Sequence, residues 1–250
     1  MSIFFLYLLF YSMSLPSSIN TLIIRFSNNI SREEIPLFRG AIIKSVGTSN
    51  SLLFHNHQGD EFRYAYPLIQ YKRVNQKAAI VCVSDGTEEI GKLFSGMDYT
   101  ISIGDREMHL EIESLKPSKY LVQVWQDMFV YRIRKWLPLN QENYEKYMAL
   151  EGLAEKYAML ERMLTGNILS FAKGVGIHFE KQVECKITAI DEPHIVMYKD
   201  VKMMAFDAEF KSNVSIPDYI GLGKGVSLGF GTVVGKYEKK DENKDNNVEE

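Results

Sequence analysis

Apolar and polar positions alternate with two different periods along the chain, and the changes of period predict a series of strands and helices. Residues 21–27 form a short β-type run, and apolar side chains at helical spacing predict a helix over residues 36–46. A nearly unbroken apolar run predicts a buried strand over residues 77–84, followed by a short helix capped by Thr87. Two strand-like pieces then occupy residues 99–114. With residues 63–72 also extended, the order is β, α, β, β, α, β, which is typical of a ferredoxin-like (RRM-like) domain.

A second unit is expected beyond Lys116-Pro117-Ser118, the predicted domain boundary. Its predicted elements are a strand over residues 120–136, a long helical region over 140–172, and strands over 183–190, 194–198 and 201–210. The helical region carries an apolar stripe that we assign to the core, formed by Tyr147, Leu150, Leu153, Tyr157, Leu160 and Leu164. The whole pattern predicts an α+β protein with two tandem ferredoxin-like (βαββαβ) domains, residues 21–117 and 118–237.

The two ends of the chain do not fit this pattern. Residues 1–20 are an apolar extension without a basic start, too short to span a bilayer. We interpret the part before Met13 as an artefact of start assignment, with translation beginning at Met13 rather than Met1, and a genuine targeting segment is the open alternative. Residues 238–250 are rich in charge and are expected to form a disordered tail.

The net charge and the two cysteines bear on which ligands and which cell compartment we expect. The 29 Lys and Arg residues against 32 Asp and Glu residues give a net charge of −3, which argues against a protein that coats nucleic acid through overall positive charge. Cys82 and Cys185 lie far apart in apolar runs, so we expect free thiols and a reducing, cytoplasmic location without a membrane partner.

Proton-handling and phosphate-binding side chains are densest in residues 53–72. His55 and His57 are followed there by Arg63, Tyr64, Tyr66, Tyr71 and Lys72. Histidine exchanges a proton near neutral pH, and Lys, Arg and Tyr hold phosphates, so the set suits metal-free RNA cleavage by general acid–base catalysis. Two alternatives stay open: structural histidines in a loop, and a metal site, which the lack of a nearby third His or Cys disfavours.

Three further features are candidates for binding RNA. Lys44 falls in the last turn of the first helix, where it either complements the helix dipole or reaches a phosphate. Arg132 and Arg134 alternate with apolar residues, which gives that strand one cationic face. The glycine-rich segment, residues 220–234, contains Lys224 and Ser227 among Gly221, Gly223, Gly225, Gly229 and Gly231. Its backbone amides would face phosphates, unless it is a hairpin without a ligand.

The glycine-rich segment fits neither nucleotide-binding motif. Lys224 is followed by Gly225 instead of Ser or Thr, and no G-x-G-x-x-G register exists. Near the end of two ferredoxin-like units, it resembles the signature of the Cas6 endoribonucleases, and the segment LFHNHQGDEFRYAYPLIQYK resembles the His-x-His and tyrosine region of the Cas6b branch. The resemblance runs from about Thr21 to Tyr237.

That resemblance implies a function and a set of site residues. Members of the family cut CRISPR repeat RNA without metal or cofactor and leave a 5′-hydroxyl and a 2′,3′-cyclic phosphate. His57 matches the principal catalytic histidine, with His55, Tyr64 and Lys44 as the other members of the site. The glycine-rich segment, with Arg63, Arg132 and Arg134, would contact the RNA.

The partners implied are CRISPR repeat RNA and subunits of an interference complex, and a homodimer is one open assembly. Two other functions remain at this stage: a repeat-RNA-binding subunit without catalysis, and a ferredoxin-like interaction module that binds no RNA. The intact His55, His57 and Tyr64 set argues against the non-catalytic subunit.

Overall fold

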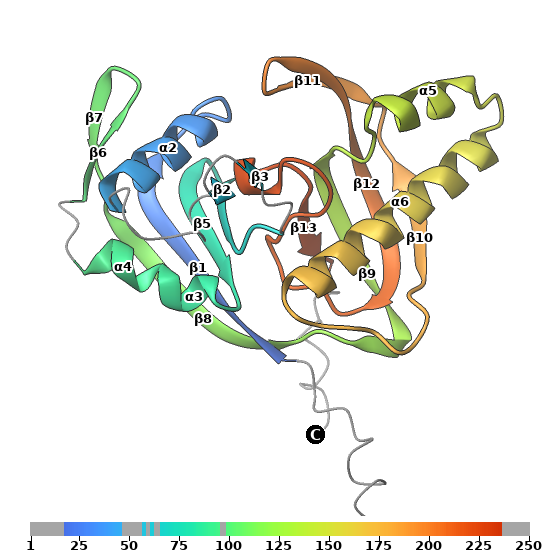
Figure 1. Ribbon diagram of the computed structural model, residues 1–250, viewed down its shortest axis with the longest axis horizontal. Helices are drawn as coiled ribbons and strands as arrows, with labels where there is room; N and C mark the ends of the chain where they lie inside the picture. The colour runs from blue at the N-terminus through green and yellow to red at the C-terminus, as the bar shows by residue number, and fades with distance from the viewer. Residues whose placement is uncertain (1–17, 47–56, 59–60, 63–65, 96–98, 237–250) are drawn as a thin grey trace, which may run out of the picture.

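The computed structural model describes residues 18–46, 57–58, 61–62, 66–95 and 99–236 of the chain (Figure 1). These residues form an α+β fold with two main antiparallel sheets, one in each ferredoxin-like unit, as the sequence pattern predicted. The first unit lies on the left of Figure 1 and the second on the right, so residues of both meet in the middle of the molecule.

The first sheet has the strand order β4-β5-β1-β8, which is the ferredoxin-like order for four strands linked by two helical crossovers. The elements in chain order are β1 (Ser18–Asn29), α2 (Ile35–Val46), β4 (Ile69–Val74), β5 (Lys77–Val83), α3 (Gly86–Glu89), α4 (Gly91–Phe94) and β8 (Ile112–Leu121). Two short hairpins stand apart from this sheet: β2 (His57–Gln58) with β3 (Glu61–Phe62), and β6 (Thr100–Ile103) with β7 (Arg106–His109).

Strand β5 is buried on both faces, as its apolar run predicted. Ile80 and Cys82 face a core that includes Phe38 of α2, whereas Val81 and Val83 face a second core shared with the other unit. Successive strand residues point to opposite faces, which explains the alternation between the two cores. The first sheet therefore has helices on one face and the second unit against the other.

Two local predictions for the first unit were wrong. Thr87 does not cap the short helix: α3 begins at Gly86, after Asp85, and the Thr87 hydroxyl donates to the Ser84 carbonyl at 2.8 Å. Two short helices, α3 and α4, occupy this stretch in place of one. In addition, β8 pairs with β1 as far as Leu121, so the predicted division after Pro117 falls inside a strand. Proline is tolerated there because β8 is an edge strand.

The second sheet repeats the topology in the order β10-β12-β9-β13, with β11 paired to β12. Its elements are β9 (Val124–Trp136), α5 (Gln141–Ala149), α6 (Leu153–Gly174), β10 (Cys185–Ile190), β11 (His194–Tyr198), β12 (Val201–Val214) and β13 (Thr232–Gly235). The predicted long helix is divided in two at Gly152, which precedes α6. Its apolar stripe is only partly core, because Leu160 and Leu164 are buried but Leu153 is 69% exposed.

The second unit lacks one helix of the ferredoxin-like pattern. The crossover from β5 to β8 in the first unit carries α3 and α4, but the crossover from β12 to β13 carries only the 3-10 turn η1 (Val226–Leu228). The glycine-rich segment makes up most of that crossover. It packs η1 against β4 and α2 of the first unit, so it lies between the two units.

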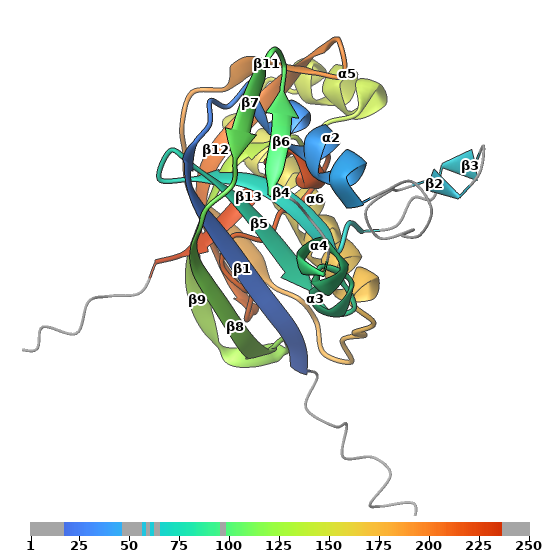
Figure 2. The same cartoon turned by 90° about the vertical axis from the view of Figure 1, so that its left-hand side faces the viewer.

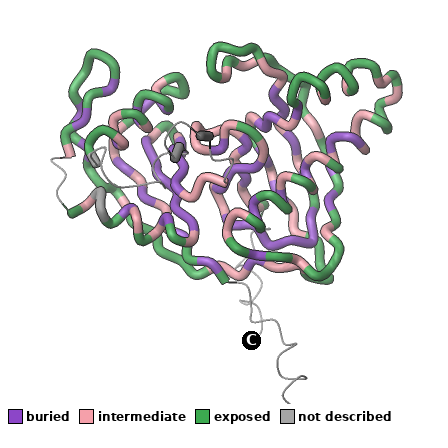
Figure 3. Tube along the Cα trace, viewed as in Figure 1, coloured by how far each residue is buried: buried purple, intermediate pink, exposed green. Residues whose placement is uncertain are grey.

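Buried residues run through both sheets and the region where the units meet (Figure 3). Cys82 and Cys185 are buried free thiols, as predicted. Within the described residues, no helix has the length and apolar character needed to cross a bilayer.

Candidate functional site

The two predicted catalytic residues that the structure places lie on consecutive elements. Lys44 is exposed in the last turn of α2, and His57 begins β2, where it pairs across the hairpin with Phe62. Figure 2 shows this hairpin projecting from one side of the molecule. His55, Arg63 and Tyr64 lie outside the described residues, so the catalytic set of four remains a prediction.

Strand β4 follows residues 55–64, which we call the histidine segment, and it turns its side chains to two different environments. Tyr71 lies in the core of the first unit, where its ring packs edge-on against Phe38 with centroids 5.9 Å apart. Gln70 and Lys72 point the other way, and both are buried. Interpreting Tyr71 and Lys72 as phosphate ligands was therefore wrong, because burial shields both of them from RNA.

Lys72 joins the two units. Its ammonium group donates a hydrogen bond to the Val226 carbonyl of η1 at 3.1 Å, and the residue is 1% exposed. Burial disfavours the charged form and lowers the pKa of Lys72 to about 7. A lysine with this pKa can lose its proton near neutral pH, which reduces the cost of burying it.

A closed ring of three hydrogen bonds lies beside Lys72. Gln70 Nε2 donates to the Tyr66 hydroxyl at 2.9 Å, the Tyr66 hydroxyl donates to the Gly221 carbonyl at 2.8 Å, and the Gly221 amide donates to Gln70 Oε1 at 3.0 Å. Burial raises the pKa of Tyr66, so its hydroxyl stays protonated and able to donate. We call Tyr66, Gln70, Lys72, Gly221 and Val226 the seam.

The glycine-rich segment uses its backbone mainly to hold itself against the protein. Its amide groups donate to acceptors within the chain at Gly221, Leu222, Lys224, Leu228, Gly229, Phe230 and Gly231. Gly231 has φ +60°, and a Cβ there would lie 1.9 Å from the Leu222 carbonyl oxygen. The expected cradle of free amides is therefore largely filled, and the close approaches that require glycine are to the protein itself. The Lys224 side chain is exposed and free to meet a ligand.

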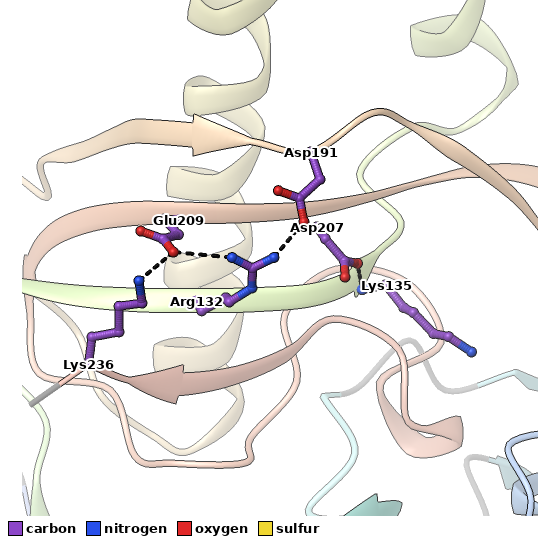
Figure 4. Close-up of polar contacts among 6 residues, drawn as sticks. All are labelled: Arg132, Lys135, Asp191, Asp207, Glu209 and Lys236. Atoms are coloured by element: carbon purple, nitrogen blue, oxygen red, sulfur yellow. Dashed lines mark hydrogen bonds and ion pairs between the residues drawn. The ribbon is translucent and has the colours of Figure 1, made fainter.

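Arg132 and Arg134 lie on the cationic face predicted for β9, but only Arg134 is fully exposed. Figure 4 shows Arg132 between two carboxylates: it donates to Glu209 at 3.1 Å and to Asp191 at 2.5 Å. Lys236 also pairs with Glu209. These ion pairs compensate the charge of Arg132, which leaves Arg134 as the better candidate for a phosphate contact on this strand.

A cationic cluster that spacing in the sequence did not reveal lies around Lys135. The backbone amide of Lys135 donates to Asp207 Oδ1 at 2.6 Å, and Lys135 has a positive φ of +49°. Figure 4 shows the Lys135 side chain pointing away from Arg132 and Asp207. Burial and the neighbouring charge of Arg32 lower the pKa of Lys135, with a smaller contribution from Arg73. Glu33 and Asp207 oppose that effect.

The cluster is formed by residues remote in sequence. Arg73 is held by a 2.6 Å hydrogen bond from its Nε to the Ile30 carbonyl, in the turn that also carries Arg32. The tertiary fold brings these two arginines of the first unit to Lys135 of the second. The sequence gives no indication that these three residues are neighbours, because they are far apart in the chain and share no motif.

Among the described residues, no three His, Cys, Asp or Glu side chains gather closely enough to hold a metal ion.

Comparison with protein families gives matches to both halves of the chain. Residues 17–120 match the Cas6b N-terminal domain, and residues 123–235 match the Cas6b C-terminal domain. A Methanocaldococcus jannaschii protein, named as uncharacterized, is 37% identical over 112 residues, which are 44% of this chain and 75% of that relative.

Solved structures show the same architecture. A crystal structure of Cas6b has a TM-score of 0.80 and 27% identity, and the alignment covers 88% of this chain and 100% of that one. The crystal structure of a CRISPR RNA processing endoribonuclease, Cas6b, has a TM-score of 0.67 at 24% identity over the same shares, which supports the fold.

Proposed function

Because the chain belongs to the Cas6b family, we propose that it is an endoribonuclease that cleaves CRISPR repeat RNA in precursor transcripts. The observation that carries this proposal is the match of both domains, in order, over almost all the residues between 17 and 235. A solved Cas6b covered over its full length supports it, and a second Cas6b structure is described as a CRISPR RNA processing endoribonuclease.

The proposed reaction is an internal transesterification. The RNA 2′-hydroxyl loses its proton to a general base, and its oxygen attacks the adjacent phosphorus. The bond from phosphorus to the 5′-oxygen breaks, and a general acid protonates that oxygen. The products are a 2′,3′-cyclic phosphate and a 5′-hydroxyl, so the step consumes no water and requires no metal-bound nucleophile.

The residues proposed for this chemistry are those of the histidine segment. His57 acts as general acid or base, while His55 and Tyr64 assist proton transfer and orient the 2′-hydroxyl. Lys44 stabilises the negative charge of the phosphorane, a role supported by its exposure at the end of the helix that precedes the histidines.

Binding of the RNA backbone is assigned to exposed or partly exposed cations. Lys224 of the glycine-rich segment and Arg134 of β9 present their side chains to solvent. The cluster of Arg32, Arg73 and Lys135 adds positive charge from both units, which Glu33 and Asp207 offset in part. Such local clusters allow phosphate binding by a protein whose net charge is −3.

The test is incubation of the protein with end-labelled repeat RNA from its own genome in EDTA, followed by analysis of the product ends. One discrete cut that leaves a cyclic phosphate supports the function and its independence of metal. Cutting that requires added divalent metal would contradict the mechanism. Tight binding without cutting would identify an RNA-binding subunit, and no affinity at low salt would overturn RNA recognition altogether.

A further inference from the structure

We infer that Tyr66 is a positioning residue for RNA cleavage, through the hydrogen bonds by which it ties the histidine segment to the glycine-rich segment of the other unit. The inference rests on the proposed function. It assigns the glycine-rich segment a second role, in which its backbone anchors the catalytic part of the chain from within the protein.

Tyr66 lies close in sequence to the residues proposed for catalysis. It lies two residues after Tyr64 and nine after His57, before β4 begins at Ile69. Two residues of extended chain span at most about 7 Å, so Tyr66 is close along the chain to the residues proposed for catalysis.

Three separate elements hold Tyr66 in place. Its hydroxyl donates to Gly221 and accepts from Gln70. Its ring packs edge-on against Phe171 of α6, with centroids 5.3 Å apart. At the end of α6, a Cβ on Gly174 would lie 2.2 Å from the Tyr66 Cβ, so the chain passes the helix at a distance that only glycine permits.

The seam joins the two units through buried polar groups. Gln70 and Lys72 are buried polar residues of the first unit whose partners include backbone groups of the second unit. A buried polar group left without a hydrogen-bond partner destabilises the folded protein. Few other positions of the two units would keep every polar group of the seam paired. The glycine-rich segment therefore holds the first unit at two points: Val226 binds Lys72 of β4, and Gly221 binds Tyr66 just before β4.

The chain offers a matched control for the Tyr66 hydroxyl. Tyr131 is buried in β9, donates to the Val214 carbonyl at 3.0 Å and accepts from the Ile216 amide at 2.9 Å. Tyr131→Phe removes one hydroxyl that both donates and accepts a hydrogen bond, as Tyr66→Phe does. The partners of Tyr131 lie in the second unit, outside the seam.

The experiment compares wild type, Tyr66→Phe and Tyr131→Phe in single-turnover cleavage of repeat RNA and in equilibrium RNA binding. We expect Tyr66→Phe to cut about 10- to 100-fold more slowly, with RNA affinity within twofold of wild type, because small misplacement of catalytic groups has effects of that size. Tyr131→Phe should cut within twofold of the wild-type rate. Cutting by Tyr66→Phe at the wild-type rate, or equal losses in both variants, would overturn the inference.

Failure of the proposed function gives a different result, because wild type itself would then not cut. A second measurement tests the anchoring without any cleavage: amide hydrogen exchange of residues 66–74 and 219–222 in the same three proteins. Tyr66→Phe should accelerate exchange of the Gly221 amide, whose acceptor Gln70 is held by the Tyr66 hydroxyl. Unchanged exchange at Gly221 would overturn the anchoring.

Discussion

The Lys72 ammonium of β4 lies 3.1 Å from the Val226 carbonyl oxygen of η1, and this hydrogen bond crosses from one ferredoxin-like unit to the other. Its donor is one of the least exposed polar side chains described in the protein. Because burial lowers the pKa of Lys72 to about 7, this side chain titrates near neutral pH, whereas solvent-exposed lysines stay charged there.

The stability of the protein should depend on pH through Lys72. Its pKa is about 7 in the folded state against the ordinary 10.5, so between these values the unfolded chain binds more protons than the folded one. The free energy of unfolding should then rise with pH in this window, by up to about 1.4 kcal/mol per pH unit, with no contribution to the slope below pH 7.

Urea denaturation of wild type and Lys72→Met at pH 6, 7.5 and 9 measures this contribution. Methionine keeps the length of the side chain and removes the titrating group. The slope above pH 7 should be smaller in Lys72→Met, and parallel pH profiles for the two proteins would contradict the assignment.

Replacing His57 should abolish most cleavage and preserve RNA binding. General acid–base groups contribute roughly a hundredfold to ten-thousandfold to a reaction rate, and His57→Ala should lose an amount in this range. Single-turnover rates and filter binding provide the measurement. His194→Ala, at an exposed histidine of β11, is the control and should cut normally. Equal rates for the two variants would remove His57 from the site.

Gly231→Ala should destabilise the fold, by on the order of 2 kcal/mol, because the new methyl group meets the Leu222 carbonyl and the residue has positive φ. Gly166→Ala makes the same change inside α6, where a Cβ meets nothing within 4 Å, and should stabilise by about 0.5–1 kcal/mol. Chemical denaturation of both variants tests the pair. Similar effects of the same sign would show that the glycine-rich segment is not closely packed.

The cationic cluster should contribute to the salt dependence of RNA binding. Lys135→Gln should weaken binding and reduce the slope of log affinity against log salt by about 0.7, the value for one phosphate contact with a single strand. Lys186→Gln is the control, because Lys186 is exposed on β10 and paired with Glu161 at 3.0 Å. If both variants keep the wild-type slope, the cluster does not contact phosphate.

Much of the fold could be predicted from local patterns. The nearly unbroken apolar run of β5 and the helical spacing before Val46 identified their elements, because a buried strand and a one-sided helix have different apolar patterns. The absence of a second crossover helix depends on tertiary packing, which periodicity does not encode. The extension of β8 to Leu121 was missed because Pro117 suggested a linker, whereas an edge strand accommodates it.

The candidate site was less predictable, because residue type does not reveal environment. Lys72 and Tyr71 read as phosphate ligands in the sequence, yet one lies in the seam and the other in the core. The glycines correctly predicted that the backbone of this segment lies very close to other atoms, but those atoms belong to the protein itself. Lys135, Arg32 and Arg73 meet only after folding, so no spacing pattern could have grouped them.

The crossover without a helix also sets a rule for recombining members of the family. Since the glycine-rich segment completes its crossover against β4, the chain's two halves are matched parts and not interchangeable modules. A chimera that joins the first unit of one relative to the second unit of another would combine β4 from one protein with the glycine-rich segment from the other. The contacts between these two parts would then be mismatched. Restoring them would require transplanting residues 66–74 together with residues 219–231 from one parent.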